Sequence, residues 1–115
     1  MTDFDKASHF DIEALKMLEE IMEDDFPKLI EVFIVDSDPR VKQLGQALEN
    51  NDYNELREIS HSFKGASGNI SALPLADLCF QLEEIVRKES LDGVPELIVS
   101  IDNEYKNVRS ILLSL

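Results

Sequence analysis

A nine-residue stretch, HSFKGASGN at positions 61–69, contains the side chains of this sequence that are best suited to chemistry. A histidine side chain in a peptide has a pKa of about 6.5, so at neutral pH most of it is unprotonated and nucleophilic. Lys64 follows His61 by three residues and supplies a flexible point charge suited to phosphate. Histidine can also form covalent intermediates. The stretch therefore predicts an imidazole with a cation beside it for a phosphoryl group.

The stretch lies inside an expected helix that begins near Asp52 and ends at Gly68 or Asn69. Asp52 followed by Glu55 predicts a capping box at its start. A helix turns about 100° per residue, so a buried apolar stripe places His61 on the opposite, water-facing side. The stripe consists of Leu56, Ile59, Phe63, Ala66 and Ile70.

Four residues share the helix face of His61, namely Arg57, Lys64, Gly65 and Gly68. A glycine inside a helix costs about 1 kcal/mol relative to alanine. Gly68 has an alternative explanation as a helix terminator, whereas Gly65 has none if the helix continues. We therefore predict that the missing side chains let another molecule approach the imidazole, and that Arg57 belongs to the same docking surface.

Helical spacing of apolar residues recurs along the chain and predicts an all-α fold. Short connections make successive helices antiparallel neighbours. We expect an antiparallel four-helix bundle with an additional short N-terminal helix, in a single domain over residues 1–115. Pro39 is expected to kink the second helix without ending it. Besides the helix of His61, the expected helices cover about 11–22, 25–50, a segment opened by Pro74 and a segment opened by Pro95.

Composition excludes several classes of function. The chain has 24 acidic and 11 basic residues and a formal net charge of −13, which argues against nucleic acid and anionic membrane as partners. Its one cysteine, Cys79, excludes an internal disulfide and is expected to be a small buried residue. No signal peptide or membrane span is predicted, so we expect a cytoplasmic protein. We expect no cofactor and no metal site, and His9 should lie near a frayed terminus.

The sequence around His61 resembles the histidine-containing phosphotransfer (HPt) domains of multistep phosphorelays. HSFKGASGN has the family's histidine, a lysine three residues later and a glycine four residues later, followed by small residues and Asn69. In LPLADLCFQLEE at positions 73–84, Cys79, Leu82 and Glu83 fall where the family pattern has cysteine, leucine and glutamate. The specific motif covers about a quarter of the chain, and the helix layout matches throughout.

The resemblance implies a phosphocarrier of the stand-alone bacterial type, without intrinsic kinase activity. His61 would accept a phosphoryl group from the aspartate of a receiver domain and pass it to another receiver. Lys64 would stabilise that group, and Gly65 and Gly68 would keep the docking surface open. The expected partners are response-regulator receiver domains and a hybrid sensor histidine kinase, and the chain is expected to be a monomer.

Some interpretations stay open at this level. Asn69 is explained equally well by a direct role and by its place at a helix end. Glu83 either orients the imidazole of His61 through a hydrogen bond or belongs to a polar network at the flank. The family often has glycine where this chain has Ser71, and a serine with positive φ there would be strained. A receiver-docking module that carries no phosphate and a plain helical structural domain are the two alternative functions.

Overall fold

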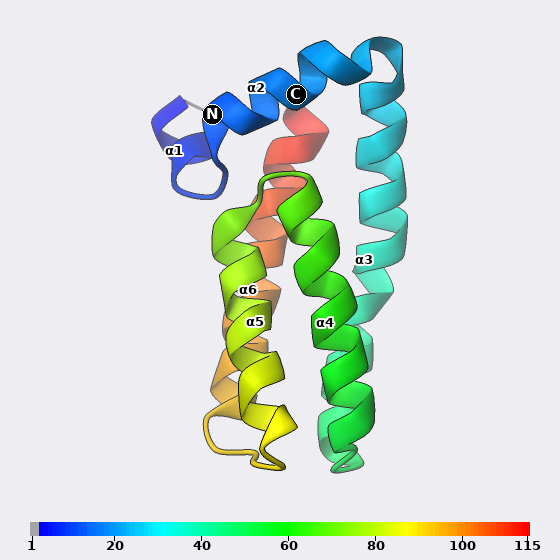
Figure 1. The fold of residues 1–115 in the computed structure, drawn as a ribbon, viewed down its shortest axis with the longest axis vertical. Helices are drawn as coiled ribbons and strands as arrows, with labels where there is room; N and C mark the ends of the chain where they lie inside the picture. Colours follow the sequence, from blue (N-terminus) through cyan, green and yellow to red (C-terminus); the bar gives the residue numbers. More distant parts are fainter. Residues whose placement is uncertain (1–2) are drawn as a thin grey trace.

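Four long helices form the body of the molecule, and each runs antiparallel to the one before it (Figure 1). The computed structural model describes residues 3–115. The helices pack in a closed ring, in which α3 contacts both α4 and α6, and α5 contacts the same two helices. The antiparallel four-helix bundle predicted from the sequence is therefore confirmed. Its helices are α3 (Phe26–Glu49), α4 (Tyr53–Asn69), α5 (Leu73–Arg87) and α6 (Val94–Ser114).

Local sequence explains the ends of these helices. The side chain of Asp52 accepts a hydrogen bond from the backbone N–H of Glu55 at 3.0 Å and so caps α4 as predicted. Pro74 and Pro95 lie in the first turns of α5 and α6, where a missing N–H does no harm. Pro39 lies inside α3, which continues through it as one helix.

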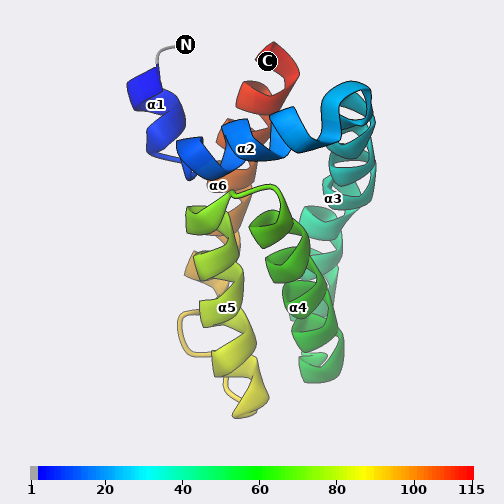
Figure 2. The same cartoon turned by 45° about the horizontal axis from the view of Figure 1, so that its top comes forward.

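An N-terminal segment crosses the top of the bundle (Figure 2). It consists of α1 (Asp3–Ala7), α2 (Ile12–Met22) and the 3₁₀ turn η1 (Glu23–Asp25). Asp11 caps α2 by accepting from the N–H of Ala14 at 3.2 Å. Its own N–H donates to the carbonyl of Ser71 at 2.9 Å, which joins the start of α2 to the turn between α4 and α5. The expected short N-terminal helix is thus α2, and α1 is an additional element.

The expectation that His9 lies at a frayed end is wrong. Its Nδ1 is 2.7 Å from Oε2 of Glu104 on α6, and the side chains of His9 and Glu104 are 21% and 15% exposed. The next residue, Phe10, is buried in the core. This segment is fixed by contacts with α6 that lie 95 residues away in sequence, which no local pattern indicates.

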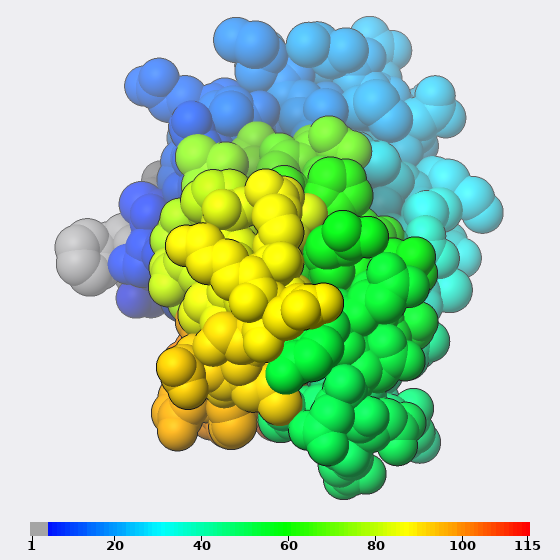
Figure 3. Space-filling model, turned by 60° about the horizontal axis from the view of Figure 1, so that its bottom comes forward, coloured from blue at the N-terminus to red at the C-terminus, as the bar shows by residue number. Residues whose placement is uncertain are grey.

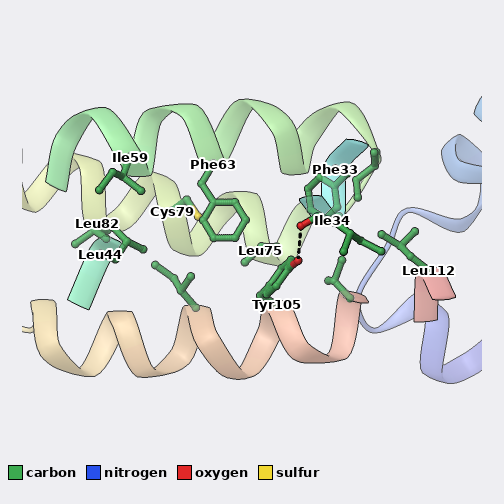
Figure 4. Close-up of a cluster of buried hydrophobic side chains, with 14 of the residues drawn as sticks. Phe33, Ile34, Leu44, Ile59, Phe63, Leu75, Cys79, Leu82, Tyr105 and Leu112 are labelled. Carbon is green, nitrogen blue, oxygen red and sulfur yellow. Dashed lines mark hydrogen bonds between the residues drawn. The ribbon is translucent and has the colours of Figure 1, made fainter. Parts of the chain in front are cut away.

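The bundle core is apolar and includes aromatic rings from three helices that contact one another (Figure 4). Phe63 of α4 meets Tyr105 of α6 edge-on at 5.7 Å between ring centroids, and Phe33 of α3 lies 6.1 Å from the same tyrosine. The hydroxyl of Tyr105 donates its one hydrogen to Asp38 Oδ1 and also lies 3.4 Å from the carbonyl oxygen of Ile34. A buried tyrosine needs such partners, because a hydroxyl without a hydrogen bond in the core lowers the free energy of unfolding by about 1–3 kcal/mol.

The turn after α4 is a Schellman motif with serine in the glycine position. Ala72 N–H donates to the carbonyl of Ser67, and Ser71 N–H donates to that of Gly68. Ser71 has φ 65°, in the left-handed region that glycine adopts without strain. The sequence therefore located the strained position correctly, and the chain tolerates serine there.

Replacing Ser71 by glycine is expected to stabilise the protein by about 0.5–1 kcal/mol. The left-handed conformation costs a non-glycine residue roughly 1–2 kcal/mol, part of which is offset by the greater freedom of glycine in the unfolded chain. Urea unfolding followed by circular dichroism measures the change. Ser110→Gly on the exposed side of α6 is the matched control and should destabilise by about 0.5 kcal/mol, because that position is helical. Equal effects at both positions would contradict the explanation.

Candidate functional site

The site is built where α4 and α5 pack most closely. These two helices and the turn between them carry small, fully buried residues, namely Ser60, Ser67, Ala72 and Cys79. Burial raises the pKa of the Cys79 thiol to about 12, so the expected buried cysteine is confirmed and is unsuited to thiolate chemistry.

One carboxylate, that of Glu83 on α5, holds the two chemically active side chains of α4. Its Oε2 lies 2.6 Å from Nδ1 of His61, and its Oε1 lies 2.6 Å from Nζ of Lys64. The carboxylate is 3% exposed, whereas the side chain of His61 is 68% exposed. The site therefore has a buried anchor and an exposed imidazole. Of the two interpretations of Glu83, the geometry shows a direct contact with His61.

The ionisation of Glu83 decides which nitrogen of His61 is nucleophilic. Burial opposes ionisation of Glu83, but hydrogen bonds from Lys64 and His61 and the charges of these partners outweigh it and lower the pKa of the carboxyl. An ionised carboxylate only accepts hydrogen bonds, so Nδ1 of His61 carries the hydrogen. In the neutral ring the lone pair is then on Nε2, which has no protein partner among residues 3–115.

Acid titration of stability tests the ionisation of Glu83. A carboxyl with a lowered pKa in the folded state contributes stability that is present above its unfolded pKa, about 4.3, and is lost as pH falls through its folded pKa. Between pH 7 and pH 3, wild type should therefore lose more free energy of unfolding than Glu83→Gln. Urea unfolding at a series of pH values measures both. The pKa of Asp38 is also lowered, chiefly by the hydroxyl of Tyr105, but Asp38 is common to both proteins. Parallel curves would contradict an ionised Glu83.

Lys64 lies between the carboxylate and an aromatic ring. Its Nζ is 5.5 Å from the ring centroid of Phe80 on α5, a distance at which a cation is attracted to the ring face. The side chain is 30% exposed, so the ammonium group lies at the edge of the site. The structure thus brings Lys64 into the same cluster as His61, but with its charge directed at Glu83.

Gly65 and Gly68 leave open space beside His61. Both are exposed, and a Cβ atom built on either would meet no atom of this chain within 4 Å. Their lack of a side chain is therefore not required by packing within the molecule. The open space agrees with the predicted docking surface at Gly65, which stays a prediction.

Arg57 and Asn69, the other predicted residues, lie on different sides of α4. Arg57 lines an open hollow of about 290 Å³ between α4 and α5 together with His61, and its Nη2 contacts Asn54. Asn69 is exposed at the last turn of α4 and lines a separate hollow beside α3. Asn69 is therefore not part of the cluster around Glu83.

Sequence reasoning missed three residues of the site, namely Glu58, Phe80 and Arg87. Glu58 and Arg87 line the same hollow as His61, and Phe80 lies under Lys64. Arg87 follows Glu83 by four residues on α5, a spacing that favours ion pairs, and its Nη2 is 3.8 Å from Glu83 Oε2. This spacing was the one signal that could have drawn attention to it. Figure 3 shows the end of the molecule where α4 begins and α5 ends, with the last part of α5 in yellow against the first part of α4 in green.

A four-helix bundle that presents an imidazole, a lysine and two glycines on one exposed helix face defines the class of histidine phosphotransfer modules. The family model of the Hpt domain matches residues 28–111. The chain belongs to the Hpt domain family. Membership of this family and the four-helix fold both support the phosphotransfer function in a phosphorelay that the sequence predicted.

Solved structures and relatives support this membership. The histidine-containing phosphotransfer protein B (HptB) of Pseudomonas aeruginosa PAO1 is 40% identical, with a TM-score of 0.89 over 92% of each chain. The phosphotransfer domain of ArcB from Escherichia coli shares the fold, with a TM-score of 0.81 at 23% identity over 94% of this chain and 92% of that one. Histidine-containing phosphotransfer protein 4 of Arabidopsis thaliana is 28% identical, covering 84% of this chain and 81% of the relative. The phosphorelay protein LuxU of Vibrio vulnificus is 24% identical over 84% of each chain.

Proposed function

We propose that this chain carries a phosphoryl group on Nε2 of His61, accepts it from the aspartyl phosphate of one receiver domain and passes it to the aspartate of another. The observation that carries the proposal is the hydrogen bond from Nδ1 of His61 to the buried carboxylate of Glu83. It fixes one tautomer and directs the lone pair of Nε2 away from the protein.

The transfer forms one bond and breaks one bond, and it needs no further reactant. The lone pair of Nε2 attacks phosphorus, the P–Nε2 bond forms, and the bond from phosphorus to the aspartate oxygen breaks with its electron pair leaving on the carboxylate. Nδ1 keeps its hydrogen, so the phosphorylated ring is an imidazolium. Glu83 accepts the hydrogen bond from that ring and offsets its positive charge, so its carboxylate is a positioning and charge-balancing group. The reverse sequence returns the phosphoryl group to a receiver.

Lys64 is proposed to stabilise the phosphoryl group. Its ammonium group is one helical turn from His61 and is held by Glu83 at 2.6 Å before the reaction. When Glu83 balances an imidazolium instead of a neutral ring, its attraction for Lys64 is shared, and the flexible lysine can turn toward the new anion. In this proposal Lys64 contacts the carboxylate of Glu83 before transfer and the phosphoryl group after it.

The proposed partners follow from the family and from the cleared surface. They are response-regulator receiver domains and a hybrid sensor histidine kinase, and transient docking suits a small interface around Arg57, Gly65 and Gly68. We propose a cytoplasmic monomer that lacks kinase activity of its own. None of the helices within residues 3–115 combines the length and apolar character required to cross a membrane.

The direct test is transfer from a phosphorylated receiver. Radiolabelled receiver is mixed with the purified chain, and the label on the chain is tested for stability in acid and in base. Phosphohistidine is lost in acid and kept in base, and peptide mapping should place it at His61. Label that resists acid, or that maps to a serine, would overturn the proposal.

A docking module that carries no phosphate is the second candidate, favoured by the open space at Gly65 and Gly68. It would bind receivers without ever becoming labelled. Both candidates predict that a bulky side chain at position 65 blocks docking.

Gly65→Leu is expected to weaken receiver binding at least tenfold while leaving the fold intact. Leucine favours helix over glycine by about 0.8 kcal/mol, so unfolding should become harder, not easier. Gly45→Leu on α3 is the matched control, because a Cβ there also meets no atom within 4 Å and that glycine lies away from His61 in sequence. Titration calorimetry with a receiver measures affinity. Unchanged binding by Gly65→Leu would show that docking does not depend on the open space at position 65.

A further inference from the structure

Two arginines from different helices line the hollow beside His61. Arg57 reaches it from α4, one turn before His61, and Arg87 reaches it from the last turn of α5. The other side chains that line it are Glu58 and Glu83. The hollow is therefore a place where basic groups of two helices converge on the imidazole.

The local charge differs from that of the whole molecule. The chain has a net charge of −13, whereas two arginines, Arg57 and Arg87, balance the two carboxylates that line the hollow. Glu83 is already engaged by His61 and Lys64, so it leaves little charge to repel an anion in the hollow. Glu58 is the one lining carboxylate that opposes such an anion.

We propose that Arg57 and Arg87 form an oxyanion subsite that holds the phosphoryl oxygens on His61 and prolongs the life of the phosphohistidine. This inference rests on the proposed function. Guanidinium groups suit the task because their planar N–H donors match phosphate oxygens in pairs. They bind a phosphoryl group that is already on Nε2, so no bond beyond the P–N bond is formed.

In the unphosphorylated protein, the carboxylate of Glu84 binds Arg87 and would compete with a phosphoryl group for it. Its Nη1 lies 3.0 Å from Oε1 of Glu84, whereas its Nη2 is 3.8 Å from Oε2 of Glu83. Its side chain is 55% exposed, so it can exchange Glu84 for a stronger anion. Glu84 does not line the hollow. Removal of Glu84 should therefore release Arg87 toward the phosphoryl group, the opposite effect to removal of Arg87.

The first experiment loads His61 with phosphoramidate, a small phosphoryl donor that needs no docking surface, and follows the half-life of the acid-labile label. The double variant Arg57→Gln/Arg87→Gln should shorten the half-life about tenfold, because the arginines stabilise the phosphorylated state by holding the phosphoryl oxygens on His61. Glu84→Gln should lengthen it. Lys106→Gln removes one positive charge from an exposed site on α6 and should leave the half-life within twofold of wild type.

The second experiment titrates inorganic phosphate into the unphosphorylated protein and follows the guanidinium N–H signals by NMR. The signals of Arg57 and Arg87 should move, at lower phosphate concentration in Glu84→Gln than in wild type. The subsite is refuted if neither signal moves, or if the half-life of the double variant equals that of Lys106→Gln. If His61 cannot be loaded at all, the proposed function fails, and the phosphate titration alone decides whether the subsite exists.

Discussion

His61→Gln is expected to take up no label from a phosphorylated receiver while it stays folded and still binds that receiver. Glutamine can accept and donate hydrogen bonds near Glu83 but lacks a nucleophilic ring nitrogen. Because the side chain is 68% exposed, its replacement should change the free energy of unfolding by no more than about 0.5 kcal/mol. Labelling kinetics and circular dichroism measure the two expectations.

The chain offers a matched control, since it has two histidines. His9→Gln removes the other imidazole, which contacts Glu104 and lies in the N-terminal segment. It should keep full labelling. Label retained by His61→Gln and lost by His9→Gln would overturn the assignment, whereas binding without label in wild type would favour the docking module.

Phe63→Ala is expected to cost about 3–5 kcal/mol of the free energy of unfolding. The ring is fully buried, meets Tyr105 edge-on, and has the guanidinium of Arg40 at 5.6 Å from its centroid on another side. Its removal leaves a cavity between α3, α4 and α6 that these helices cannot close without moving. Small domains have only about 5–15 kcal/mol in total, so the variant should be close to unfolding.

Phe80→Ala is the control for this prediction. Phe80 is the same residue type on the neighbouring helix, but it is 45% exposed and contacts the charged end of Lys64. Its loss should cost clearly less, because less apolar area leaves contact with the protein. Urea unfolding of the two variants measures the difference. Equal losses in the free energy of unfolding would contradict the prediction that the buried ring of Phe63 stabilises the protein more than the exposed ring of Phe80.

The helices and the exposed face of His61 could be predicted because both depend on local sequence. Apolar spacing on α4 sets which side of the helix is buried, and the position of His61 follows from a rotation of 100° per residue. The same reasoning placed Arg57, Lys64 and the two glycines on that face. It required no knowledge of any other helix.

The partners of His61 could not be predicted in this way. The contact with Glu83 depends on how α5 is set along α4, and the sequence pattern left it as one of two interpretations. The ring of Phe80 under Lys64 and the approach of Arg87 depend on the same register between helices. The element α1 was missed because five residues are too few to show a periodic stripe.

The attachment of α2 has a consequence for how this molecule could be diversified. A main-chain hydrogen bond from Asp11 to Ser71 anchors its start, and Leu15 buries its inner side. Neither depends on the outward residues Met17 and Ile21, which are 61% and 72% exposed. Residues on the outer surface of α2 can therefore change without weakening the attachment of α2 to the bundle. This face could therefore vary between copies of this chain while the site around His61 keeps its structure.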